Sequence, residues 1–314
     1  MPNSEASILK TFSDKAFIDL EQQYADMLTA LGLNLGRSRF RKSFDDYRKV
    51  SDVLEKSDSK IIPDDLVEDF RHATYDLSQL LDIYTATNDY PNKTILKDKF
   101  KKLNNGSASP SDEISSNSIA RDTQFELKLY SDLIDSGITC VLDEPRPDIE
   151  VLGQEYLYAV ECKRIFSDND SKVSKRVGEA RDQIKAYLED NQEGIGIIAV
   201  DITRRLTGGN TYLRAKNVHV ATARLNQDLN EFRKKFARFW TPNRIGDQRI
   251  VAVLLHASMY SYLEDRELAS HASQVMIQNI YDTPWSNLLF KNALNDVFAP
   301  LYIHKTGELK LHGH

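Results

Sequence analysis

The sequence contains few residues of the kinds that build disulfide scaffolds, fibres or membrane spans. It has two cysteines, 13 glycines and nine prolines among 314 residues. Two cysteines cannot form the disulfide framework of a small secreted domain, and the low glycine and proline content excludes collagen-like and low-complexity chains. No apolar run approaches the roughly 20 residues that cross a bilayer. The amino terminus lacks the basic and then apolar pattern of a signal peptide, so we expect a cytosolic protein without a membrane partner.

The remaining composition is that of an ordinary soluble protein, with 41% hydrophobic and 28% charged residues. A chain of this length has room for two domains or for one elaborated domain. Cys140 and Cys162 both lie in predicted strands, and we interpret them as small buried hydrophobic residues without redox or metal chemistry.

The charge is distributed unevenly. The net charge is −6, but residues 161–250 contain eighteen Lys and Arg against twelve Asp and Glu, which makes this region +6 and the remainder −12. Distributed positive charge of this kind binds phosphate backbones. Any single cation could equally be part of a solvated helix face, so the asymmetry is the stronger observation. The candidate nucleic-acid-binding cations are Lys172, Lys175, Arg176, Arg181, Arg204 and Arg205.

A predicted β-hairpin is the centre of the second half of the chain. Residues 149–152 and 156–165 are short apolar strands, joined at Gly153 because glycine adopts turn conformations without steric cost. Side chains alternate along a strand, so Glu161 and Lys163 share one face, and the partner strand begins beside Asp148. Two acids and an ammonium group should therefore meet at one end of the hairpin. Burying them is costly unless a metal ion or an anion is bound there.

Asp148, twelve intervening residues and then Glu161-Cys162-Lys163 form a pattern that resembles the PD-(D/E)xK nuclease superfamily. The surrounding elements agree with the superfamily core. A helix from about Ser116 to Gly137 carries Ile119, Glu126 and Leu133 on one stripe, and a strand follows at 138–142. After the hairpin come a helix at 173–188 and a strand at 194–200. We therefore predict an α/β fold, with a restriction-endonuclease-like αβββαβ core and a mixed sheet over residues 116–203.

The resemblance implies a Mg²⁺ or Mn²⁺ site. Asp148, Glu161 and the backbone carbonyl of Cys162 would hold the ion, Glu126 would support a second ion or its waters, and Lys163 would orient the attacking water. Gln183 and Tyr187 are similar to the Gln-x-x-x-Tyr feature that positions substrate in part of the superfamily, and Glu150 is a further candidate ligand. Each assignment has a structural rival. Asp148 could cap a turn, Glu161 and Lys163 could form an exposed edge pair, and Glu126 could be a helix-face charge.

The chain is predicted to contain two domains. Residues 1–104 have helical periodicity at 6–31, 39–54 and 66–85, residues 105–115 are small and polar, and residues 116–314 contain the nuclease pattern with a carboxyl-terminal extension. The extension includes a predicted helix at 217–240 and strands at 250–255 and 274–277. We expect the helical region to bind a second copy of the chain or a partner protein.

The resemblance implies a metal-dependent nuclease that hydrolyses DNA, of the kind found among restriction and anti-phage defence effectors, with RNA as the alternative substrate. A second hypothesis is a catalytically inactive nuclease-fold protein that acts as a nucleic-acid-binding or scaffolding module. The complete Asp, Glu and Lys set favours the enzyme.

Overall fold

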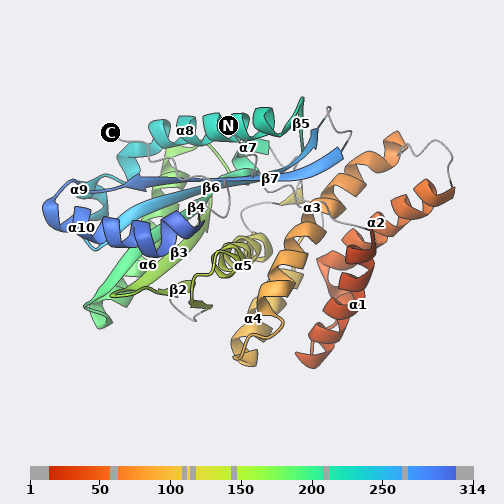
Figure 1. Cartoon of the computed structure of the whole chain (residues 1–314), viewed down its shortest axis with the longest axis horizontal. Helices are drawn as coiled ribbons and strands as arrows, with labels where there is room; N and C mark the ends of the chain where they lie inside the picture. The colour runs from red at the N-terminus through yellow and green to blue at the C-terminus, as the bar shows by residue number, and fades with distance from the viewer. Residues whose placement is uncertain are drawn as a thin grey trace, which may run out of the picture.

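In the computed structural model, helices cover both faces of one mixed β-sheet (Figure 1). The structure describes residues 14–56, 63–107, 112–113, 118–142, 147–207, 212–263 and 268–301. The predicted α/β class is confirmed. Among the described residues, no helix has both the length and the apolar character needed to cross a membrane.

The first helices form a layer at one side of the molecule, and the remaining elements alternate around the sheet (Figure 1). The amino-terminal elements are α1 (Asp14–Ala30), η1 (Leu35–Arg37), α2 (Arg39–Lys56), α3 (Asp64–Thr87) and α4 (Lys93–Asn104). They are followed by α5 (Ile119–Asp135), β1 (Cys140–Leu142), β2 (Ile149–Leu152), β3 (Leu157–Arg164), α6 (Asp170–Asp190) and β4 (Gly194–Asp201). The last elements are α7 (Thr203–Thr207), β5 (Tyr212–Ala215), α8 (Val218–Phe236), η3 (Ala237–Phe239), α9 (Pro242–Ile245), β6 (Ile250–Leu263), β7 (Leu268–Asn279), α10 (Pro284–Ala293) and η4 (Leu294–Phe298).

The sheet has the strand order β1-β2-β3-β4-β6-β5, with β7 also paired to β6. The pairs β1–β2, β2–β3 and β6–β7 are antiparallel, whereas β3–β4, β4–β6 and β5–β6 are parallel. The segment from α5 to β4 therefore has the predicted order of helix, three strands, helix and strand. The parallel strands β3, β4 and β6 run in the same direction, and β6 continues beyond the ends of β3 and β4.

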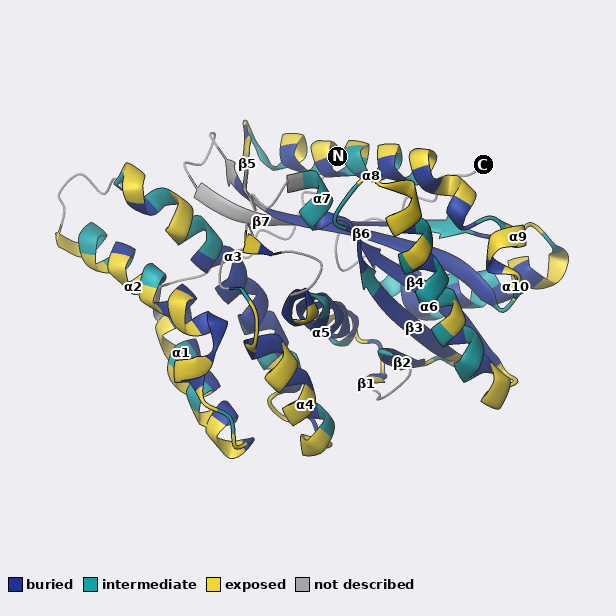
Figure 2. Cartoon of the chain, turned by 180° about the vertical axis from the view of Figure 1, so that it is seen from behind, coloured by how far each residue is buried: buried dark blue, intermediate teal, exposed yellow. Residues whose placement is uncertain are grey.

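Both faces of the sheet are covered by packed side chains. All eight residues of β4 are buried, as expected for a parallel strand with helices on both sides. Ala159 packs with α6 and α8 on one face, whereas Val160 and Cys162 pack on the opposite face with α5. Figure 2 shows the buried central strands and the exposed outer sides of α6 and α8. Cys140 and Cys162 are free and buried, which confirms their interpretation as core residues.

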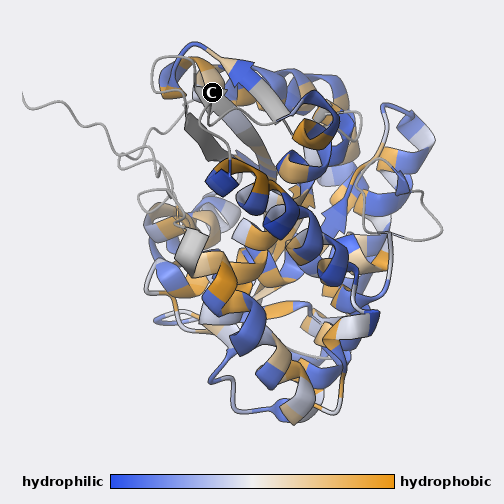
Figure 3. Ribbon diagram, turned by 90° about the vertical axis from the view of Figure 1, so that its right-hand side faces the viewer, coloured by the Kyte–Doolittle hydropathy of each residue, from blue (hydrophilic) through white to orange (hydrophobic). Residues whose placement is uncertain are grey.

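α5 is buried almost all round, because it lies between the sheet and helices α3 and α4. A helix in such a position is usually apolar, yet α5 carries several charged residues that pair with the amino-terminal helices. Arg121 lies 2.7 Å from Asp76, and Lys128 lies 3.3 Å from Asp82. The helices combine hydrophilic and hydrophobic residues along their length (Figure 3).

The amino-terminal helices share a core with the sheet. One hydrophobic cluster includes Phe17 and Phe40 from these helices, together with Ile149 and Val160 from the hairpin. Helices at 14–30, 39–56 and 64–87 match the predicted periodic stretches within the described residues. The domain boundary at 105–115 stays a prediction, and residues 108–111 and 114–117 lie outside the described residues.

Three details differ from the sequence predictions. β6 and β7 extend far beyond the predicted strands, because polar residues such as Ser258 continue the pairing register between them. Ile119 is 62% exposed, since it is the first residue of α5 and lies outside the packed part of that helix. Gly153 is absent from the described glycines with positive φ, and it is required because a Cβ atom would lie 2.4 Å from Tyr158.

Candidate active site

The hairpin places the predicted acidic residues opposite each other. Ile149 pairs with Val160 in the antiparallel register, so Asp148, just before β2, lies across from Glu161. Successive residues of a strand point to opposite faces. Glu161 and Lys163 therefore share the face of Ala159, which α6 covers, and the predicted arrangement of these residues is observed.

The contacts in this group are short and mostly hidden from solvent. Lys163 Nζ lies 2.6 Å from Glu161 Oε1, and the two side chains are 12% and 1% exposed. The backbone N–H of Cys162 donates a hydrogen bond of 2.8 Å to Asp148 Oδ2. β3 is an interior strand, paired on both sides, so the interpretation of Glu161 and Lys163 as an exposed edge pair is wrong. Asp148 bonds across the hairpin, which an ordinary turn cap would not do.

Glu161 is held in an environment that disfavours its negative charge. Burial raises the pKa of Glu161 to about 7, the neighbouring charge of Asp148 adds to the rise, and Lys163 counteracts it. In addition, Glu161 Oε2 is buried without a hydrogen-bond partner among the described residues. A buried polar atom of this kind is costly unless it is protonated or binds a cation. The site is therefore short of one positive charge.

The donors present fit a hard divalent cation. Two carboxylates that face each other across the hairpin, one with an unused oxygen, are the ligand type that Mg²⁺ and Mn²⁺ prefer, with water completing the coordination. The described residues contain no group of three or more His, Cys, Asp or Glu side chains suited to holding a metal ion. Protein ligation here would depend on Asp148, Glu161 and a backbone oxygen, and the carbonyl of Cys162 stays a predicted ligand.

Glu126 has a partner that the sequence did not indicate. Its carboxylate lies on α5, 2.5 Å from Lys99 Nζ on α4, and both side chains are less than 10% exposed. Its charge contributes to raising the pKa of Cys162, after burial and Asp148. Lys99 already supplies a positive charge to Glu126, so a second metal ion there would have to compete with this ammonium group.

Helix α6 contributes polar side chains to the same face of the hairpin. The hydroxyl of Tyr187 donates a hydrogen bond to Glu150 Oε2 on β2. Gln183 lies one helical turn earlier and is half-buried. Tyr187 therefore connects α6 to β2, the strand that follows Asp148, and the Glu150 carboxylate is occupied by this contact.

The six predicted nucleic-acid-binding cations fall into three pairs with different surroundings. Arg176 lies 3.2 Å from Asp122, and Arg205 forms an ion pair with Asp168. Lys172 and Lys175 are exposed, and the described structure gives Lys175 only a long contact of 3.9 Å, to Glu179. The remaining two donate to backbone carbonyls, Arg181 to Arg244 and Arg204 to Glu113.

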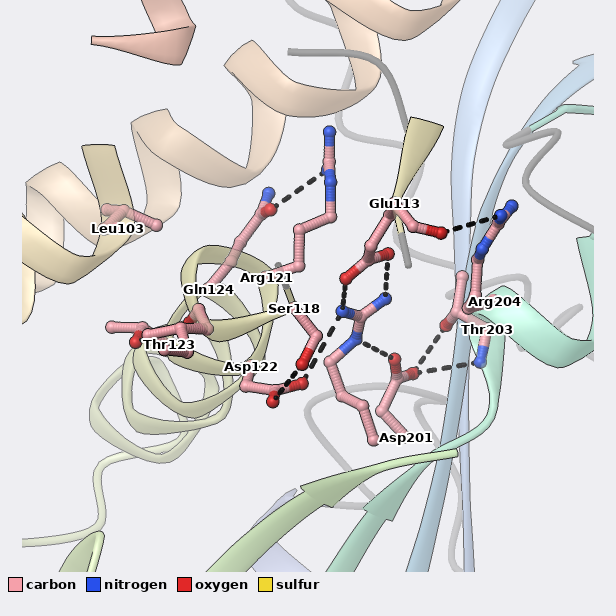
Figure 4. Close-up of polar contacts among 12 residues, drawn as sticks. Leu103, Glu113, Ser118, Arg121, Asp122, Thr123, Gln124, Asp201, Thr203 and Arg204 are labelled. Carbon is pink, nitrogen blue, oxygen red and sulfur yellow. Dashed lines mark hydrogen bonds and ion pairs between the residues drawn. The ribbon is translucent and has the colours of Figure 1, made fainter. Parts of the chain in front are cut away.

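The residue after Lys163 is the centre of a buried network that sequence reasoning missed. Arg164 lies 2.5 Å from Glu113 and 3.2 Å from Asp201. Arg164 and Asp201 are the last residues of β3 and β4, and they are in register with His256 near the middle of β6. His256 Nδ1 lies 3.0 Å from Asp201. Figure 4 shows Glu113 on a short segment between the helices and the strands, joined to Arg204, and Asp201 with Thr203 on the strand side.

The network surrounds a small cavity of about 40 Å³, lined by residues that include Gln124, Arg164 and His256. Burial raises the pKa of Asp201, but the hydrogen bond and charge of His256 and the charge of Arg164 outweigh it, so the pKa is lowered overall. In the sequence, the only indication of this network was a charged residue at the end of each predicted apolar strand. Glu113 lies within the predicted linker, where burial was not expected.

Comparisons with family models, with curated proteins and with solved structures find no match to this chain. The functional argument therefore depends on the geometry of the site.

Proposed function

We propose that this protein is a metal-dependent nuclease with a restriction-endonuclease-like core. The observation that supports the proposal best is the grouping of Asp148, Glu161 and Lys163 at one end of the hairpin, with a buried Glu161 oxygen that has no hydrogen-bond partner in the described part of the chain. An acidic pair beside a lysine is suited to phosphodiester hydrolysis. The order of elements from α5 to β4 supports the same proposal.

The carboxylates and the lysine would have separate tasks. Asp148 and Glu161 would hold Mg²⁺ or Mn²⁺, which supplies Lewis-acid stabilisation of the charge that develops on the phosphate. Lys163 would orient the attacking water through its ammonium group and donate a hydrogen bond to a nonbridging phosphate oxygen. Tyr187 and the hydrogen bond from the Cys162 N–H would fix the hairpin carboxylates Glu150 and Asp148.

Cleavage of defined nucleic acids tests the proposal. The purified protein should cut DNA in Mg²⁺ or Mn²⁺ and lose activity in a chelator, whereas Asp148→Ala and Lys163→Ala should remain folded by circular dichroism and inactive. Single- and double-stranded DNA and RNA should be compared in parallel, because the site geometry fits any phosphodiester. Equal cutting by the parent and both variants would contradict the assignment of the site.

The scaffolding alternative predicts a different metal response. Lys99 already neutralises Glu126, which removes one ligand that a two-metal site would use, and this contact is the observation that favours an inactive fold. Calorimetry distinguishes the hypotheses, because only the nuclease hypothesis requires Mg²⁺ or Mn²⁺ binding that disappears in Asp148→Ala.

A further inference from the structure

A second cavity lies immediately beyond Lys163 along the chain. It has a volume of about 350 Å³ and lies between residues 164–167 and the first turns of α6. Four of its eight lining residues are basic and one is acidic. A cavity with this excess of positive charge is suited to an anion.

The cations that line the cavity differ in their availability. Arg164 and Arg176 are fixed by carboxylates, Arg164 by Glu113 and Arg176 by Asp122. Lys172 is exposed and has no ion pair in the described part of the chain, and Lys175 has only the 3.9 Å contact to Glu179. The charges of the two arginines are therefore largely compensated, and the two lysines supply the positive charge that is available to a ligand.

Two backbone N–H groups at the start of α6 already have hydrogen-bond partners. The Asn169 side chain accepts hydrogen bonds from the N–H groups of Ser171 and Lys172, at 3.0 and 3.2 Å. An anion in the cavity would therefore be held mainly by side chains. Phe166, which also lines the cavity, lies under the Arg164 guanidinium at 5.0 Å and offers an apolar surface to a sugar or a base.

The position of the cavity relative to the catalytic group indicates what it binds. Arg164 is the next residue after Lys163 and the last residue of β3, so the cavity begins where the strand that carries Lys163 ends. We propose that this cavity, with Lys172 and Lys175, binds a phosphate of the nucleic acid strand next to the phosphate that is cut. The inference rests on the proposed function and adds a substrate-binding subsite to it.

Binding should be measured separately from cutting. The probe is a fluorescently labelled single-stranded oligonucleotide, bound to Asp148→Ala protein and followed by anisotropy at several salt concentrations. Adding Lys172→Ala and Lys175→Ala should weaken binding at least tenfold at low salt, and should reduce the slope of log K against log salt by about 0.7, because the one phosphate that these lysines neutralise on a single strand contributes about 0.7. The matched control adds Lys97→Ala and Lys291→Ala, two exposed lysines on α4 and α10, and should keep most of the affinity and slope.

Three forms of the oligonucleotide distinguish the source of the phosphate. If the lysine dependence appears only with a 5′- or 3′-phosphorylated end, the cavity binds a terminal phosphate, and if it also appears with hydroxyl ends, it binds an internal phosphodiester. Equal losses in the lysine variant and the control would overturn the subsite even if the parent cuts DNA. Conversely, if binding depends on the two lysines but the parent protein does not cut any of the nucleic acids, the subsite would be supported and the proposed nuclease function would be refuted.

Discussion

Lys163 Nζ lies 2.6 Å from one oxygen of Glu161, while the other oxygen of this buried carboxylate has no hydrogen-bond partner in the described structure. One ammonium group therefore does not fully compensate the Asp148 and Glu161 pair. The site therefore has an excess of negative charge, and several measurable properties follow from it.

Stability of the metal-free protein should fall as the pH rises from about 4.5 to 7. The pKa of Glu161 is raised from 4.5 to about 7, so the folded state binds more protons than the unfolded state in this window. The destabilisation should approach about 3 kcal/mol above pH 7. Urea unfolding in a chelator should show this decline in the parent and a much flatter profile in Glu161→Gln. A parent profile as flat as that of the variant would contradict the environment assigned to Glu161.

Binding of Mg²⁺ should release a proton near neutral pH. The cation requires ionised Glu161, so affinity should increase as the pH rises through about 7. Calorimetry in two buffers with different ionisation enthalpies gives the number of protons released, and a melting scan with Mg²⁺ should show stabilisation. Asp148→Asn is the control, and it should show neither effect. Stabilisation of this variant equal to that of the parent would place the ion elsewhere.

Glu113→Gln should destabilise the protein by about 1.5–3 kcal/mol, because the buried Arg164 loses its nearest carboxylate and keeps Asp201 at 3.2 Å. The control is Arg224→Gln, which also neutralises one member of an ion pair. Its pair with Asp228 is partly exposed, so the loss of stability should be less than about 1 kcal/mol. Urea unfolding compares the two. Similar small losses would show that Glu113 is not a structural partner of the strand that carries Lys163.

Lys99→Met should also destabilise the protein by about 3–5 kcal/mol, because Glu126 would keep a buried negative charge without its partner. Combining it with Glu126→Gln should recover much of that loss. A double-mutant cycle measured by urea unfolding gives the coupling energy. Additive effects of the two changes would mean that the contact contributes little.

The sequence alone was sufficient to predict the local features. Alternation along 156–165 placed Glu161 and Lys163 on one face, and the apolar run at 194–200 predicted a strand covered on both sides, which β4 is. These features depend on the periodicity of apolar and polar residues within one segment, and this periodicity can be read directly from the sequence. Gly137 was likewise recognisable as the end of a helix, and it has a φ of 77°.

Only the tertiary structure decided which charged residues meet. Glu113 contacts Arg164 and Lys99 contacts Glu126 because the layers of the fold bring separate segments together. No periodicity marks such partners, since a lysine or a glutamate on a helix has the same local pattern whether water or a buried carboxylate faces it. For the same reason the sequence predicted a group of available cations, whereas the fold engages Arg176 and Arg205 in ion pairs and leaves Lys172 and Lys175 exposed.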